Sequence, residues 1–190
     1  MMDSPIRLTT SFVSFAKNLG FIAVGFSRPH RPAHFDSFLR RLADRQHGDM
    51  TWLEKHLDLR EDPSKLLDGC QAIVSLAYPY ANARHETEDR YWVARYADPF
   101  REDYHYRLKK LGDDLAGWLQ QAYPESRTRV CVDSSPVLEK SIAWQSGLGF
   151  IGKNTLLVIP GYGSYFFLVE ILTNAPLQFS LVEPMPDQCG

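Results

Sequence analysis

The sequence predicts an α+β, or layered α/β, domain with helices packed around a sheet. Helical repeats and strand-like apolar runs are mixed along the chain without strict β-α-β alternation, which is typical of layered α+β folds. No G-x-G-x-x-G follows a first strand and opens a helix, so a doubly wound nucleotide-binding fold is disfavoured. The 190 residues are enough for one domain with a hydrophobic core, or for one domain with an appendage.

The first half of the chain starts with a helical repeat. Apolar residues recur three and four positions apart over residues 8–19, and Gly20 follows as a stop signal. Further along, the apolar patterns predict a buried strand, two helices, a strong strand and a polar loop, at residues 21–27, 33–44, 49–57, 71–80 and 81–88.

The second half contains the clearest amphipathic helix, over residues 103–123. A strand is expected at residues 128–133. Ser135 and Pro136 then resemble the N-cap and first residue of a helix that ends near Ser146. Residues 154–160 and 164–174 flank Gly-Tyr-Gly, as in a β-hairpin.

The composition disfavours several classes of protein. The net charge of -2 shows no basic excess of the kind that indicates nucleic-acid binding, although a local basic patch is compatible with it. Apolar runs are too short to span a bilayer, and the N-terminus lacks the apolar core of a secretory signal. Three widely spaced cysteines do not form a disulfide framework, so a reducing cytoplasm is the expected compartment.

Asp133 is the first candidate functional residue. It stands at the carboxyl end of a predicted strand, where acids often line a cleft, and partial burial there would let its carboxyl group donate a proton near neutral pH. Asp is also common at helix starts. The sequence therefore leaves two readings open for Asp133, a helix cap and a proton donor.

Asp103, Tyr104 and His105 form a second candidate group at the start of the long predicted helix. Asp103 suits the N-cap of this helix as well as it suits a functional site. His105 suits a proton carrier, a metal ligand or an ordinary surface residue. The six histidines include no pair four residues apart with a carboxylate between its members, so a zinc hydrolase is poorly supported.

A glycine-rich segment at residues 147–154 is the third candidate. Such a loop lets the backbone approach a ligand closely, and Lys153 adds a positive charge for a phosphate. A simple helix stop and turn explains the glycines better than a ligand-binding loop does. Arg60 and Arg95 lie near proline-containing turns, where they suit either a phosphate or amide group of a ligand or ordinary solvation.

Short segments along nearly the whole chain, from about residue 5 to residue 190, resemble the N-terminal half of epoxyqueuosine reductases. This family comprises cobalamin-dependent, iron–sulfur enzymes of the last step of queuosine synthesis in tRNA. Residues 132–177 carry the most specific part of the resemblance. The segments are, in order, HGDMTWL, LREDPSKLL, VSLAYPY, RYA, DYH, VDSSPVLEK, GLGFIGKNT, GSYFFLVEILTNAPL and the final CG.

The resemblance implies a nitroreductase-like, cobalamin-binding catalytic domain at residues 1–180, with a central mixed sheet flanked by helices. Residues 181–190 would begin a ferredoxin-like domain, which in the family holds two [4Fe–4S] clusters. Because the sequence ends at Cys-Gly, Cys189 would be the first cluster ligand and no cluster is expected in this chain.

The resemblance also assigns roles to single residues. Asp133 matches the proton-donating carboxylate of the family. Positions that match cobalamin contacts are Arg60, Tyr96, Asp103, Tyr104, His105, Leu157 and Leu168. Lys140, Lys153 and Asn154 fall where relatives meet the tRNA.

The function that the resemblance implies is the reduction of epoxyqueuosine to queuosine in tRNA. The expected partners are the modified tRNA and an electron-donor protein, which would act through the iron–sulfur domain. We expect a cytoplasmic monomer without membrane contact. Two alternatives remain open at this point: a cobalamin-binding or trafficking module without redox chemistry, and a reductase of another small substrate such as an organohalide.

Overall fold

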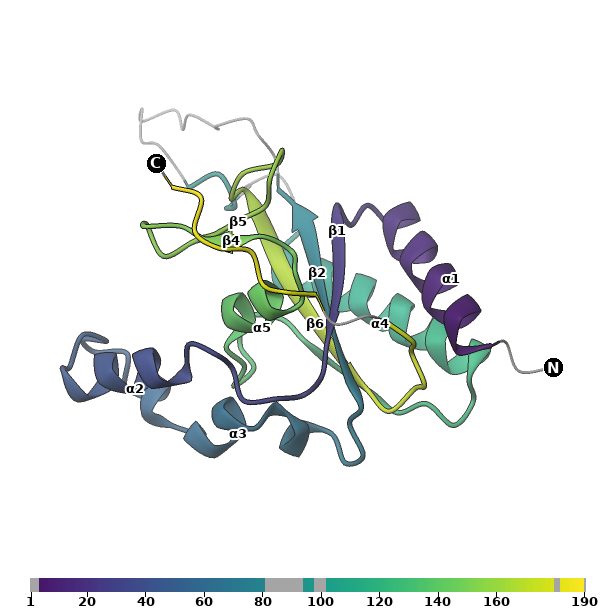
Figure 1. The fold of residues 1–190 in the computed structure, drawn as a ribbon, viewed down its shortest axis with the longest axis horizontal. Coiled ribbons are helices and arrows are strands. Elements are labelled where there is room, and N and C mark those ends of the chain that lie inside the picture. The colour runs from purple at the N-terminus through teal and green to yellow at the C-terminus, as the bar shows by residue number, and fades with distance from the viewer. Residues whose placement is uncertain (1–3, 81–93, 98–101, 180–181, 190) are drawn as a thin grey trace.

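A four-stranded sheet forms the centre of the computed structural model, which describes residues 4–80, 94–97, 102–179 and 182–189 (Figure 1). Across the sheet the strands follow the order β1 (Ala23–Ser27), β2 (Ala72–Pro79), β6 (Phe166–Thr173) and β3 (Thr128–Cys131). All three neighbouring pairs, β1 with β2, β2 with β6 and β6 with β3, are antiparallel. The α+β class is confirmed, whereas the expectation of a mixed sheet is wrong for the described strands.

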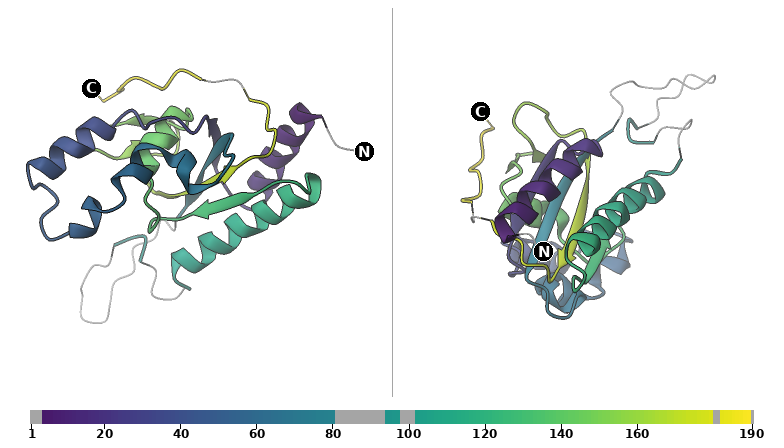
Figure 2. Two further views of the ribbon diagram at one scale, coloured as in Figure 1. Left: turned by 90° about the horizontal axis from the view of Figure 1, so that it is seen from below. Right: turned by 90° about the vertical axis from the view of Figure 1, so that its right-hand side faces the viewer.

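Two long helices cover one face of this sheet (Figure 2). They are α1 (Pro5–Asn18) and α4 (Tyr104–Ala122), which confirm the two helical repeats. The ring centroids of Phe12 in α1 and Trp118 in α4 lie 5.9 Å apart, and both helices pack on the alternate, inward side chains of β2 and β6. Within the described residues, no helix is long and apolar enough to cross a membrane.

The opposite face of the sheet carries α5 (Glu139–Gln145) and a small second sheet. That small sheet pairs β4 (Phe150–Ile151) with β5 (Leu157–Val158). The predicted hairpin across Gly-Tyr-Gly is therefore wrong: β5 pairs with β4, and β6 pairs with β2 and β3. Among the described residues, the turn itself contributes one isolated antiparallel β-bridge, between Ile159 and Gly163.

The helix after β3 begins later than the sequence suggests. Instead of starting at Ser135, α5 starts at Glu139, and its N-cap position is Leu138 without a side-chain cap. Asp133 takes a left-handed backbone conformation with φ of +50°, and two short turns follow at Ser134 and Val137. The Ser-Pro pair therefore belongs to a loop between β3 and α5 and not to a helix start.

Between β1 and β2 the chain forms a lobe of short helices, at the lower left in Figure 1. The lobe contains α2 (Phe35–Ala43), η1 (Thr51–Glu54), α3 (Leu57–Glu61) and η2 (Pro63–Leu66). The expected helix at residues 49–57 is split, because His56 adopts a left-handed conformation with φ of +57° between η1 and α3. The loop expected at residues 81–88 lies outside the described residues.

Candidate active site

Asp133 sits on the turn that leaves β3, with its side chain 60% exposed. Its backbone N–H donates a hydrogen bond to Glu139 Oε1 at 2.7 Å. The cap of α5 is Leu138, so the helix-cap reading of Asp133 is wrong. Aspartate tolerates the left-handed backbone conformation better than most residues, which explains how an acid is held at this sharp turn.

The first turn of α4 meets this carboxylate. Tyr104 donates its hydroxyl hydrogen to Asp133 Oδ2 at 2.9 Å, and His105 Nε2 lies 3.0 Å from the same oxygen. Asp103 is the N-cap of α4, as the capping interpretation predicts: its Oδ1 accepts the backbone N–H of His105 at 2.8 Å. The same oxygen lies 2.7 Å from His105 Nδ1. His105 thus bridges two carboxylates, and Asp103 is both the N-cap of α4 and a member of this site.

The two carboxylates favour a protonated imidazole. Burial lowers the pKa of His105, but hydrogen bonds and charges from Asp103 and Asp133 outweigh this effect and raise the pKa above its ordinary value. Burial, followed by the hydrogen bond and charge of Asp133, raises the pKa of Tyr104 far above its usual range. Tyr104 therefore stays a hydroxyl donor, while His105 can hold or release a proton beside Asp133.

Aromatic stacking fixes Tyr104 in place. Its ring lies parallel to Phe167 of β6, with centroids 4.3 Å apart, and stacks on His105 at 3.9 Å. Tyr96 approaches the other side with a centroid distance of 6.1 Å and is half exposed. The structure therefore brings Tyr96, Asp103, Tyr104 and His105 together around Asp133, although they lie far from it in sequence.

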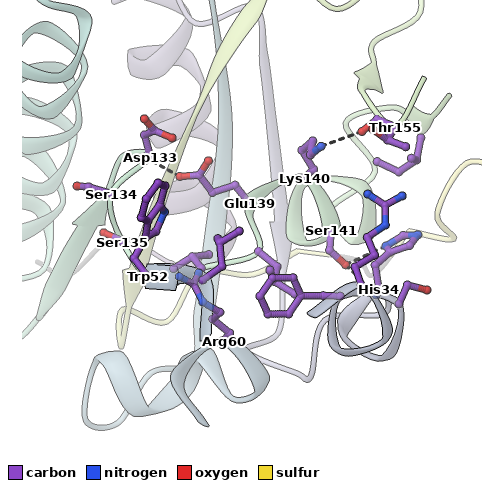
Figure 3. A pocket seen from close by; sticks show the side chains of 17 residues that line it. His34, Trp52, Arg60, Asp133, Ser134, Ser135, Glu139, Lys140, Ser141 and Thr155 are labelled. Atoms are coloured by element: carbon purple, nitrogen blue, oxygen red, sulfur yellow. Dashed lines mark hydrogen bonds between the residues drawn. The ribbon is translucent and has the colours of Figure 1, made fainter. Parts of the chain in front are cut away.

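Asp133 also lines a cavity of about 640 Å³ between α5 and the lobe of short helices (Figure 3). Glu139 and Lys140 of α5 line it together with Asp133, and the segment between β1 and β2 contributes aromatic and cationic side chains. These side chains are His34, Phe38, Arg41, Trp52 and Arg60. The cavity therefore combines apolar rings, cations and acids at the place where Asp133 emerges.

Arg60 is the buried cation of this cavity. It is 9% exposed, its Nε has no hydrogen-bond partner, and its guanidinium lies 5.8 Å from the centre of the Phe38 ring. Burial lowers the pKa of Arg60, and the charge of Glu139 opposes that effect. A buried N–H without a partner is uncommon in folded proteins, and it marks Arg60 as a candidate for a further polar contact.

The loop at residues 152–156 forms the rim above α5. Lys140 Nζ donates to the backbone oxygen of Thr155 at 2.8 Å, and the Asn154 side chain accepts the N–H of Leu156 at 3.1 Å. Asn154 therefore shapes the loop with its side-chain oxygen. Lys153 stands in the same loop and interacts electrostatically with Asp187.

A second, smaller cavity of about 170 Å³ lies on the other side of α5. Leu157 of β5 and Leu168 of β6 line it together with Phe166, and Glu139 and Lys140 line both cavities. The two leucines that the family resemblance assigns to cobalamin contacts thus line the same cavity.

Two further candidates lie at the edges of the site. Cys189 is exposed and adjoins the rim loop, since a Cβ built on Gly152 would lie 3.3 Å from its Sγ. Within the described part of the chain, no group of three or more His, Cys, Asp and Glu residues is arranged to hold a metal ion. Arg95 stacks over the ring of Tyr165 at 4.7 Å, and its buried Nε, like that of Arg60, has no hydrogen-bond partner.

Sequence reasoning missed two acids. Glu139 is the first residue of α5 and holds the Asp133 turn, and Glu170 is wholly buried in the middle of β6. Glu170 does leave a signal in the sequence, as the one charged residue in the apolar run YFFLVEIL. Glu139 looks like an ordinary surface acid of a helix, so its role became visible only with the turn geometry.

Comparisons with known proteins give one consistent family. The family model described as epoxyqueuosine reductase QueG, DUF1730, matches residues 60–134. An epoxyqueuosine reductase of Pseudomonas aeruginosa is 37% identical over 194 aligned residues, which cover 98% of this chain and 52% of the relative. The chain spans about half the length of the curated relatives it matches.

Solved structures agree with this result. An epoxyqueuosine reductase bound to an epoxyqueuosine-modified tRNA stem loop has a TM-score of 0.81 at 27% identity, covering 98% of this chain and 50% of that one. The Bacillus subtilis enzyme, with its catalytic aspartate loop swung out of the active site, gives 0.80 at 26%, covering 98% and 50%. A B12-dependent reductive dehalogenase shares the fold, with a TM-score of 0.61 at 14% identity over all of this chain and 22% of its own.

Proposed function

This chain is a homologue of the epoxyqueuosine reductases along about half of their length, and on that premise we propose that it binds the epoxide-bearing nucleoside of a tRNA and protonates the oxygen that leaves it. Asp133 is the proton donor in this proposal. The observation that carries it is the convergence of Tyr104 and His105 on Asp133 Oδ2, at 2.9 and 3.0 Å, beside an open cavity.

The reaction explains why such a group is needed. Removing an epoxide oxygen as water consumes two electrons and two protons, and the oxygen leaves easily only if it is protonated as its bond to carbon breaks. Asp133 supplies that proton at the cavity wall. Tyr104 and His105 then donate to the carboxylate that remains, and His105 balances its charge because two acids raise the pKa of the imidazole.

Cobalamin is the cofactor that this site suits. The side chains fit such a group in two respects: Leu157 and Leu168 form one apolar wall, and Arg60 presents a buried N–H without a partner. When bound, cobalamin would supply the electrons of the reduction. Arg60 would donate a hydrogen bond to a polar edge of the cofactor, and Tyr96 would cover the site beside Tyr104.

The basic rim would hold the tRNA. Lys140, which lines the cavity, and Lys153, which stands in the rim loop, suit backbone phosphates, which position a nucleic acid without reading its sequence. Asn154 fixes the shape of the rim loop. Cys189, next to this rim, would be a ligand of an iron–sulfur cluster completed by residues of a longer protein, through which an electron-donor protein would act in the cytoplasm.

The test uses the chain with cobalamin, a strong chemical reductant and a stem loop carrying epoxyqueuosine. We expect the visible spectrum of cobalamin to change on titration with the protein, and queuosine to appear in the stem loop. A spectral change without queuosine would leave a cobalamin-binding module and contradict the reductase proposal. An unchanged spectrum would contradict the cofactor assignment.

A further inference from the structure

Glu170 is the most unusual charged residue of the described chain. It lies in β6 between Ser75 of β2 and Cys131 of β3, and alternation along β6 turns its side chain to the α5 face of the sheet, between Leu168 and Leu172. It is fully buried, and neither carboxyl oxygen has a hydrogen-bond partner. The hydroxyl of Ser75 is engaged with Ser146.

An ionised carboxylate is strongly disfavoured in such surroundings. Burial first, and the charge of Glu139 second, raise the pKa of Glu170 well above its ordinary value. Cys131 is the other titratable group that interacts with it, and burial raises the pKa of this thiol as well. Full burial without a hydrogen-bond partner therefore favours the neutral, protonated form of Glu170. An apolar residue like its strand neighbours would fill the space without this cost.

Glu139 connects this buried acid to the site. It lines both cavities, and its Oε1 accepts the backbone N–H of Asp133. Burial, followed by the charge of Asp133, raises the pKa of Glu139 to about 7. The Asp133 hydrogen bond and the charges of Arg60 and His105 oppose this rise, and Lys140 also interacts with Glu139. Glu139 can thus gain and lose a proton near neutral pH.

The proposed function creates a need for such a group. Each reduction consumes two protons, whereas Asp133 holds one, so its carboxylate must be protonated again. We propose that Glu139 and Glu170 form a proton-holding pair behind the active site, and that Glu139 returns a proton to Asp133 after Asp133 has protonated the leaving oxygen.

The step balances without a further reactant. An O–H bond breaks at Glu139 and one forms at Asp133, and no electron moves. The Glu139 carboxylate that remains interacts with the charge of Arg60 and then takes up a proton from the bulk solvent through the cavities. Glu170, held neutral by burial, keeps a proton close to Glu139 throughout. The inference rests on the proposed function for its last step, while the proton held by the pair can be tested separately.

The first experiment measures unfolding by urea from about pH 5 to about pH 8 for the wild type and Glu170→Gln. An acid with a raised folded-state pKa stabilises the fold fully below its unfolded-state pKa, and this stability is lost as pH rises toward the folded value. Each such proton changes the unfolding equilibrium constant by about tenfold per pH unit. We expect the unfolding equilibrium of Glu170→Gln to depend less steeply on pH than that of the wild type, by the contribution of one proton. The exposed control Glu183→Gln should keep the wild-type pH dependence.

The second experiment separates the first turnover from later ones in Glu139→Gln. With cobalamin and reductant present, steady-state turnover should fall about tenfold or more and much further than the first turnover, because Asp133 delivers the first proton and Glu139 is needed only to replace it. If Glu170→Gln fails to fold, Glu170→Met replaces it in an equally apolar shape.

The outcomes are distinguishable. An unchanged pH slope in the Glu170 variant overturns the inference, whatever the enzyme assay shows. A reduced slope with wild-type steady-state turnover in Glu139→Gln overturns the transfer step. If the wild type itself makes no queuosine, the proposed function fails and the transfer step fails with it, but a reduced slope in the Glu170 variant would still establish that Glu170 holds a proton.

Discussion

Replacing His105 with glutamine tests whether the imidazole holds the two acids of the site together. The ring lies 2.7 Å from Asp103 Oδ1 and 3.0 Å from Asp133 Oδ2. Burial lowers the pKa of His105, but the two acids raise it above its ordinary value of 6.5 overall. Its stabilising contribution should therefore be complete below pH 6.5 and should disappear as pH rises through the folded-state pKa.

The size of the effect follows from exposure. The imidazole is 42% exposed, and the two acids are 55% and 60% exposed, so water screens both pairs. Exposed ion pairs contribute about 0.2–1 kcal/mol each, which gives about 1 kcal/mol for the two together. Glutamine keeps one hydrogen-bond donor and no charge, so most of this contribution should be lost.

Urea unfolding at about pH 6 and about pH 8.5 measures the free energy of unfolding on both sides of this transition. We expect His105→Gln to lose about 1 kcal/mol at the lower pH and much less at the higher pH. The exposed histidine variant His30→Gln serves as the control and should change little at either pH. An equal loss at both pH values would refute the charge argument, and so would an insensitivity of the low-pH loss to added salt.

Three further outcomes are expected. Gly112→Ala should lower the free energy of unfolding by about 1–3 kcal/mol in a urea titration, because its Cβ would clash with Val130 Cγ1; Gly117→Ala in the same helix, with open space, should be neutral or stabilising. Lys140→Gln should reduce the salt dependence of stem-loop binding by about one phosphate contact in a fluorescence titration, and an unchanged slope would remove Lys140 from the interface. Iron and sulfide analysis of the purified chain should find no [4Fe–4S] cluster, since three cysteines cannot provide its four thiolates, and stoichiometric amounts would contradict this.

Hydrophobic patterns along the sequence correctly predicted elements that depend mainly on residues close together in the chain. The apolar run at residues 71–80 became the central strand β2, and the stripe over residues 103–123 became α4 with Asp103 as its cap. The Ser-Pro helix start failed because the left-handed turn at Asp133 delays α5 to Glu139. The hairpin failed because β6 has better partners in β2 and β3 than in the two-residue strand β5.

The sequence identified several candidate residues of the site but not the contacts between them. Asp133 and the Asp-Tyr-His segment could be singled out one by one, but their contact joins residues 28 and 29 positions apart and depends on how α4 packs beside β3 and β6. Likewise, no local sequence pattern predicts that the Glu139 side chain accepts a hydrogen bond from the backbone N–H of Asp133. Contacts between residues far apart in sequence depend on the order of the strands in the sheet, which hydrophobic periodicity along the chain does not specify.

Asp133→Asn is the substitution that tests the central claim most directly. Asparagine keeps the shape and tolerates the left-handed turn, so the fold and cobalamin binding should persist, and the spectrum of bound cobalamin checks this. It cannot donate a carboxyl proton. The rate of queuosine formation in the stem loop should therefore fall by roughly 10²-fold or more, while the exposed control Asp114→Asn should match the wild type. A wild-type rate in a folded, cobalamin-bound Asp133→Asn protein would contradict the account.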